Sequence, residues 1–185
     1  MKKASILLLL ILFAIFSGFY QEKLKISINY ILDEGAKVPG FDALTPEKKM
    51  EFIERARIVA PFDYYHNHRT ISWLYRLDAK QLSILKWGVT GFFLIWFLLI
   101  NVLLLRVLNV HNQVLRFLPW IYGALIVVSI LLFVSGAITG LQQSAYTLSR
   151  KIMGALQSVI PALILWPASM IFNHSGLKLP NERNE

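Results

Sequence analysis

A short polar segment, residues 63–70, contains the densest group of side chains in this sequence that could do chemistry. Asp63, His66 and His68 offer a carboxylate and two imidazoles, which are ordinary ligands of zinc. In an extended strand the two histidines would share one face. A metal site usually needs a third or fourth ligand, and the sequence offers none in sight beyond Asp63. We expect no metal or other cofactor, and a metal-handling protein or metalloenzyme built on this cluster is an alternative.

The same region is also rich in aromatic and basic residues. Tyrosine and tryptophan are enriched where a membrane meets water, and arginine binds phosphates and carboxylates. These residue types also dominate the contact energy of protein interfaces. The sequence therefore predicts a surface that contacts lipid or a membrane partner. Its expected members are Tyr64, Tyr65, Arg69, Trp73, Tyr75 and Arg76.

The other reactive residue types form no catalytic motif. The chain has no cysteine, which excludes disulfides, thiolate metal sites and cysteine nucleophiles. No serine has a base at a convincing spacing, and there is no convincing carboxylate pair and no phosphate-binding loop. The net charge is +8, but the cations do not form a basic stripe with stacking aromatic residues, so nucleic acid is not an expected partner. We predict a protein that is not an enzyme.

Four long apolar segments decide the class of protein. They cover residues 4–20, 85–108, 117–140 and 152–172, and none contains an acidic residue. A helix needs about 20 apolar residues to cross a hydrocarbon core about 30 Å thick, and the last three segments reach that length. The composition agrees, with 56% hydrophobic residues and a mean hydropathy of +0.53. The sequence predicts an all-α, polytopic membrane protein with four transmembrane helices.

Two lysines at the start of the chain set the expected orientation. Lys2 and Lys3 precede the first apolar segment with no acid nearby, which places the N-terminus in the cytoplasm. The segment lacks the pair of small residues that a signal-peptide cleavage site requires, so an uncleaved signal anchor is expected. The predicted order is a first transmembrane helix in 1–20, a mostly helical extracytoplasmic segment in 21–84, a three-helix transmembrane region in 85–172 with loops at 109–116 and 141–151, and a cytoplasmic tail in 173–185.

Capping residues mark two helix starts in the extracytoplasmic segment. Thr45 and Pro46 are a typical N-cap and first residue, and they predict a helix that runs to about Val59. Asp78 and Gln81 form a variant of the capping box, which predicts that the second membrane helix begins there, above the bilayer.

Helix contacts inside the membrane can be predicted from small and polar residues. Asn101 needs a hydrogen-bond partner because a buried amide is costly without one, so we expect it to bond to another helix. Pro161 and Pro167 should bend the last helix, and the carbonyls that they release must find partners. A transporter or channel subunit is a further alternative, which would need more polar lining than Asn101 supplies. Small residues expected in close helix contacts are Ala14, Gly18, Gly136, Gly140, Gly154, Ser158 and Ala162.

The whole layout resembles the small exosortase-system-associated membrane proteins of bacteria. An exosortase is a membrane transpeptidase that processes the sorting tails of exported proteins and depends on a cysteine. The resemblance therefore implies an accessory protein in the bacterial cytoplasmic (inner) membrane, with an exosortase as a candidate partner. The expected partners are membrane lipids and either another integral membrane protein or a second copy of the chain in a homo-oligomer. No functional residue is carried over from the family. Besides the lysine-led first helix, the resemblance rests on Asp63-Tyr64-Tyr65, on Ser149-Arg150-Lys151, and on the later Ile160-Pro161 and Trp166-Pro167-Ala168.

Overall fold

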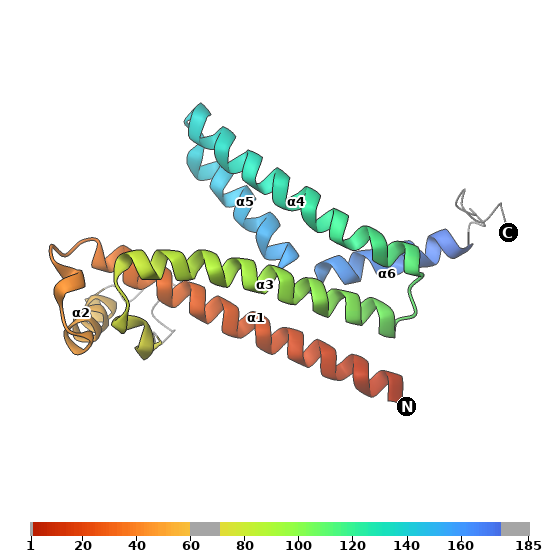
Figure 1. Ribbon diagram of the computed structural model, residues 1–185, viewed down its shortest axis with the longest axis horizontal. Helices are drawn as coiled ribbons and strands as arrows, with labels where there is room; N and C mark the ends of the chain where they lie inside the picture. The colour runs from red at the N-terminus through yellow and green to blue at the C-terminus, as the bar shows by residue number, and fades with distance from the viewer. Residues whose placement is uncertain (1, 60–70, 175–185) are drawn as a thin grey trace. The chain divides into compact units, whose positions relative to one another are not determined.

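The computed structural model describes residues 2–59 and 71–174, and every regular element in this part of the chain is a helix (Figure 1). The all-α prediction is confirmed. The elements are α1 (Lys2–Gly35), η1 (Phe41–Ala43), α2 (Pro46–Val59), η3 (Ser72–Arg76), α3 (Ala79–Val107), α4 (Asn112–Thr139), α5 (Gln142–Leu156) and α6 (Ile160–His174).

Among residues 2–59 and 71–174, three helices are long and apolar enough to cross a membrane, namely α1, α3 and α4. A fourth candidate span consists of α5 and α6 taken together, which are bent by 65° at a short break. The described part of the chain is therefore all-helical, with three to four candidate membrane spans.

Helix α1 continues well beyond the predicted end at residue 20 and stops at Gly35. The apolar run ends near residue 20, but nothing breaks the helix at that point. The chain has no proline or glycine between Gly18 and Gly35. Leu24, Ile28 and Ile31 are buried and recur at the spacing of one helix face. Hydropathy thus predicted the apolar first part of this helix. The second part, from about residue 21 to Gly35, is amphipathic and was not predicted to continue it.

The chain divides into two compact units. One is residues 16–93, called the loop unit here, and contains the connection between α1 and α3. The other is residues 1–15 and 94–185, called the hairpin unit, and contains α4, α5 and α6. Helices α1 and α3 each contribute to both units.

Both helix starts predicted in the loop unit are present. The side-chain oxygen of Thr45 lies 3.5 Å from the backbone nitrogen of Lys48, and α2 begins at Pro46. At the start of α3, the Asp78 carboxylate accepts from the Gln81 backbone at 2.7 Å, and the Gln81 side chain accepts from the Asp78 backbone at 3.1 Å. This reciprocal pair is the capping box expected from the sequence.

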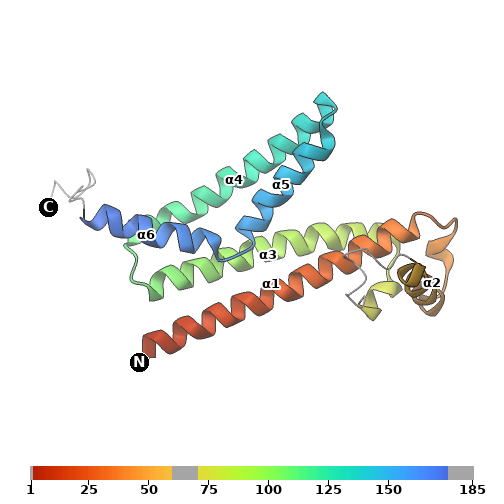
Figure 2. The same cartoon turned by 180° about the vertical axis from the view of Figure 1, so that it is seen from behind.

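The hairpin unit differs from prediction in its connections. Figures 1 and 2 both show α5 returning alongside α4, so most of the predicted loop at 141–151 is helical. Helix α4 ends at Thr139 and is capped by Gly140, whose φ of 75° is the left-handed conformation that glycine adopts freely. Residues 142–151 look like a loop because they are polar, but they contain no helix breaker, and one face of them packs on α4. The other predicted loop, 109–116, is also shorter, because α4 already begins at Asn112 with His111 as its N-cap.

The last predicted membrane helix, 152–172, is broken rather than merely bent. It consists of the end of α5 and nearly all of α6, with residues 157–159 between them. Pro161 is part of the cause, since it has no N–H to donate to the carbonyl of Gln157. Pro167 lies inside α6, which continues past it.

Candidate functional site

The break between α5 and α6 is surrounded by a buried polar group that several hydrogen bonds connect. Asn101, on α3, is 0% exposed, and its amide nitrogen lies 2.8 Å from the carbonyl of Ser158 and 3.0 Å from the hydroxyl of Tyr122. The same nitrogen lies 2.8 Å from the carbonyl of Phe97, one turn earlier on its own helix. Its side-chain oxygen accepts a hydrogen bond from the backbone of Ala162 at 3.0 Å.

Tyr122 completes this group from α4. Its hydroxyl donates to the carbonyl of Leu156 at 2.8 Å, and its side chain is 3% exposed. Leu156 is the last residue of α5 and Ser158 lies in the break, so both of these carbonyls have lost their place in a continuous helix. Asn101 and Tyr122 supply the donors that these carbonyls need.

Ser158 also caps the helix that follows it. Its hydroxyl donates to the carbonyl of Ala155 at 2.6 Å and accepts from the backbone of Ile160 at 3.1 Å. We call Asn101, Tyr122, Leu156, Ser158 and Ala162 the pinned break. It ties α3 and α4 to both sides of the interruption between α5 and α6.

The hydrogen bond expected between Asn101 and another helix is present, and Tyr122 and Leu156 are the members of the site that sequence reasoning missed. A signal was available, because Tyr122 is a hydroxyl-bearing residue in an otherwise apolar run, as Asn101 is an amide in one. Two such residues in neighbouring membrane helices are natural hydrogen-bond partners. In chemical terms the pinned break is a satisfied structural group, since each polar atom of the Asn101 side chain is already bonded within the protein.

A second polar contact joins α4 and α5. The hydroxyls of Ser129 and Ser149 lie 2.6 Å apart, and Ser129 is 3% exposed. The buried residues Tyr122, Ser129 and Gly136 are spaced by seven residues, so they follow one stripe of α4. This stripe is the surface on which α5 lies, and it places Ser149 level with Ser129.

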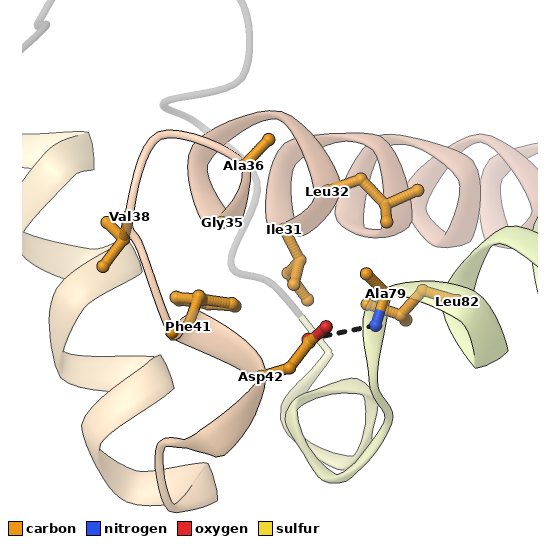
Figure 3. Close-up of a pocket in the computed structure, with 10 residues that line it drawn as sticks. Ile31, Leu32, Gly35, Ala36, Val38, Phe41, Asp42, Ala79 and Leu82 are labelled. Atoms are coloured by element: carbon orange, nitrogen blue, oxygen red, sulfur yellow. Dashed lines mark hydrogen bonds between the residues drawn. The ribbon is translucent and has the colours of Figure 1, made fainter.

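The loop unit contains a shallow hollow of about 320 Å³ between the end of α1, η1 and the start of α3 (Figure 3). Its lining is mostly apolar, with Ile31, Leu32, Phe41 and Leu82 among its residues. The carboxylate at its edge, Asp42, accepts a hydrogen bond from the first backbone N–H of α3 at 3.1 Å. Asp42 thus acts as an additional cap for α3.

A buried cation, Lys49, connects the parts of the loop unit. Lys49 is 4% exposed, and its ammonium donates a hydrogen bond to the carbonyl of Leu77 at 3.3 Å. The same ammonium lies 5.6 Å from the centre of the Phe41 ring, within the range of a cation–π contact. Lys49 therefore joins α2 to η1 and to the segment before α3.

The contact surface predicted around residues 64–76 lies partly within the described residues. Trp73 and Arg76, on η3, are exposed, and Trp73 is 42% exposed. Tyr75 is 2% exposed and belongs to the core of the loop unit, so its place on a contact surface was wrong. The 3₁₀ geometry of η3 turns Leu74 and Tyr75 inward and its neighbours outward. Tyr64, Tyr65 and Arg69 lie outside the described residues.

The proposed metal ligands Asp63, His66 and His68 also lie outside the described residues. Within residues 2–59 and 71–174, no three His, Asp or Glu side chains come together in a group that could hold a metal ion.

The small residues expected in helix contacts divide into two groups. Ala14, Gly136 and Ala162 are buried, and Gly18 and Ser158 are half-buried. Gly140 and Gly154 are exposed, which contradicts their expected role in close helix contacts. Gly140 instead ends α4, and a Cβ built on Gly154 would meet no atom within 4 Å. The small-residue repeat on the last predicted helix fails because the break separates Gly154 from Ala162.

Comparison of the chain with protein-family models, with characterised proteins and with solved structures finds no match.

Proposed function

We propose that this chain is a non-enzymatic accessory or assembly protein that acts through a partner in the same membrane. The sequence resemblance supports an exosortase-linked protein-sorting system as its setting, in the cytoplasmic (inner) membrane of a bacterium. The proposal assigns the chain a structural task, which is to hold and present surfaces to another membrane protein.

The observation that carries the proposal is the way in which the hairpin unit uses its buried polar groups. Asn101 and Tyr122 donate to the carbonyls of Leu156 and Ser158, and so hold a broken helix in one bent shape. Burying polar groups in a membrane protein is costly, and here it produces a fixed geometry rather than unpaired groups for a substrate. A bent, pinned helix pair suits a protein whose task is to present its surfaces.

The proposed topology has four spans, with α5 and α6 together as the fourth and both termini in the cytoplasm. Because the natural chain has no cysteine, single cysteines report position without background. In intact cells, an impermeant maleimide should label Ser72→Cys directly and Ser175→Cys only after lysis. The reverse pattern would overturn the orientation.

Co-purification from native membranes tests the function itself. Extraction in a mild detergent should recover the chain together with a second integral membrane protein, identified by mass spectrometry. Trp73→Ala combined with Arg76→Ala should reduce its recovery, since both side chains are exposed on η3. Lys80→Ala is the matched control, because Lys80 is an exposed cation nearby on α3. Recovery of the chain alone would leave lipid anchoring as the better role for these aromatic residues.

A further inference from the structure

Helix α5 carries a cationic face, and no acidic residue lies among the described residues of the hairpin unit. Successive residues of a helix differ by about 100°, so Gln143, Thr147, Arg150 and Lys151 lie on the side opposite the one that packs on α4. All four are exposed, whereas Ser149 and Leu156 face α4. We call these four residues the cationic face of α5. The neighbouring exposed residues Tyr146 and Leu148 are 44% and 49% exposed.

The cations lie at about the level of a part of α4 that is apolar and exposed. Ser149 is level with Ser129, which lies ten residues before the end of α4, or about 15 Å along the helix. Between these points Ile130, Val134 and Ile138 are 56%, 48% and 79% exposed, which is the surface expected against lipid tails. Ser129 lies near the centre of the apolar segment 117–140, so with α4 as a membrane span this level is near the middle of a hydrocarbon core about 30 Å thick. The side chains of Arg150 and Lys151 are then too short to place their charges among the lipid headgroups.

The sequence also restricts what can neutralise these charges. No acidic residue lies between Asp78 and Glu182, so α3 to α6 contain none. A second copy of this unit placed against the same face would bring cations against cations. The four apolar segments of this chain contain no acidic residue, so a second copy supplies no carboxylate from them. A carboxylate at the level of these cations therefore comes from a transmembrane helix of another protein.

We infer that the cationic face of α5 binds a transmembrane helix of a different protein that carries an acidic residue near the middle of its span. The inference rests on the proposed function and specifies the chemistry of its partner. Ionisable residues within membranes pair with one another, and charge complementarity selects the partner. Gln143 and Thr147 extend the face with hydrogen-bonding groups.

A binding experiment with a defined probe tests this chemistry without the natural partner. The full chain carries a donor dye on Leu141→Cys and is reconstituted in phosphatidylcholine vesicles. The probes are synthetic polyleucine transmembrane peptides with a central Asp, Asn or Leu and an acceptor dye. Energy transfer should show that the Asp peptide binds at least about tenfold more tightly than the Leu peptide. The double variant Arg150→Leu, Lys151→Leu should lose this preference.

Two matched variants make the result specific. Arg106→Leu combined with Arg116→Leu removes two exposed cations elsewhere in the same unit, and it should keep the preference for the Asp peptide. Arg150→Asp combined with Lys151→Asp should instead prefer a peptide with a central Lys, which shows that the variant protein is still folded.

Three results would overturn the inference. The Asp and Leu peptides could bind equally, or the preference could survive in the Leu double variant. The preference could also disappear when phosphatidylglycerol is added, in which case lipid phosphates neutralise the face. Failure of co-purification from native membranes would remove the proposed function but leave a preference for the Asp peptide intact, so the two failures are distinguishable.

Discussion

Replacing Asn101 with leucine should lower the free energy of unfolding by about 2–4 kcal/mol. The substitution leaves the carbonyl of Ser158 and the N–H of Ala162 without their side-chain partners, and it removes the hydrogen bond to Tyr122. A buried backbone group that loses its partner costs about 1–3 kcal/mol, although hydrogen bonds between membrane helices are often weaker than in water-soluble proteins. Equilibrium unfolding of the full chain in bicelles measures the change.

Asn112→Leu is the matched control for this experiment. Asn112 is the first residue of α4 and is exposed, so the same chemical change there should alter stability by less than about 0.5 kcal/mol. Tyr122→Phe should give an intermediate loss of about 1–2 kcal/mol, and its combination with Asn101→Leu should cost less than the sum of the two. If Asn101→Leu is as stable as the natural chain, the pinned break does not hold the helices together.

Replacing Gly35 with alanine should destabilise the loop unit by about 1–3 kcal/mol. A Cβ at this position would lie 2.7 and 2.8 Å from two carbons of the Phe41 ring, and the ring itself is buried. The ring cannot move away without disturbing η1 and the hollow that it lines (Figure 3). Hydrogen exchange measured by mass spectrometry should show roughly tenfold faster exchange in peptides that cover residues 31–44.

Gly88→Ala is the contrasting control, because it makes the same change where there is open space. Gly88 lies within α3, and a Cβ there would meet no atom within 4 Å. Alanine is the better helix former by about 0.5–1 kcal/mol, so this variant should be as stable as the natural chain or more stable. Equal effects of the two substitutions would contradict the close contact between Gly35 and Phe41.

Local signals in the sequence were sufficient for the class of protein and for several helix boundaries. Apolar runs predict helices that cross a membrane because the hydrocarbon core demands internally bonded backbone of a given length. The starts of α2 and α3 were predicted from Thr45 with Pro46 and from Asp78 with Gln81, because capping depends on residues within one turn.

Apolar and polar runs in the sequence predicted the wrong helix boundaries at two places. The apolar run of α1 ends near residue 20 while the helix continues to Gly35, because its second part packs on other residues of the loop unit. The polar residues of α5 look like a loop, yet they form a helix because Ser149 and Leu156 find hydrogen-bond partners on α4.

The sequence by itself determined that this is an all-helical membrane protein, that its apolar segments contain no acidic residue, and that Asn101 needs a partner. Only the tertiary structure decided which residues are those partners, because the hydrogen bonds from Asn101 to Tyr122, Ser158 and Ala162 join residues far apart in the chain. It likewise decided that Tyr75 is buried and that Gly140 and Gly154 are not, since burial depends on what packs against a residue and not on its type. The position of Arg150 and Lys151, next in sequence to a residue that is level with Ser129, also depends on tertiary structure, because it follows from the pairing of α5 with α4.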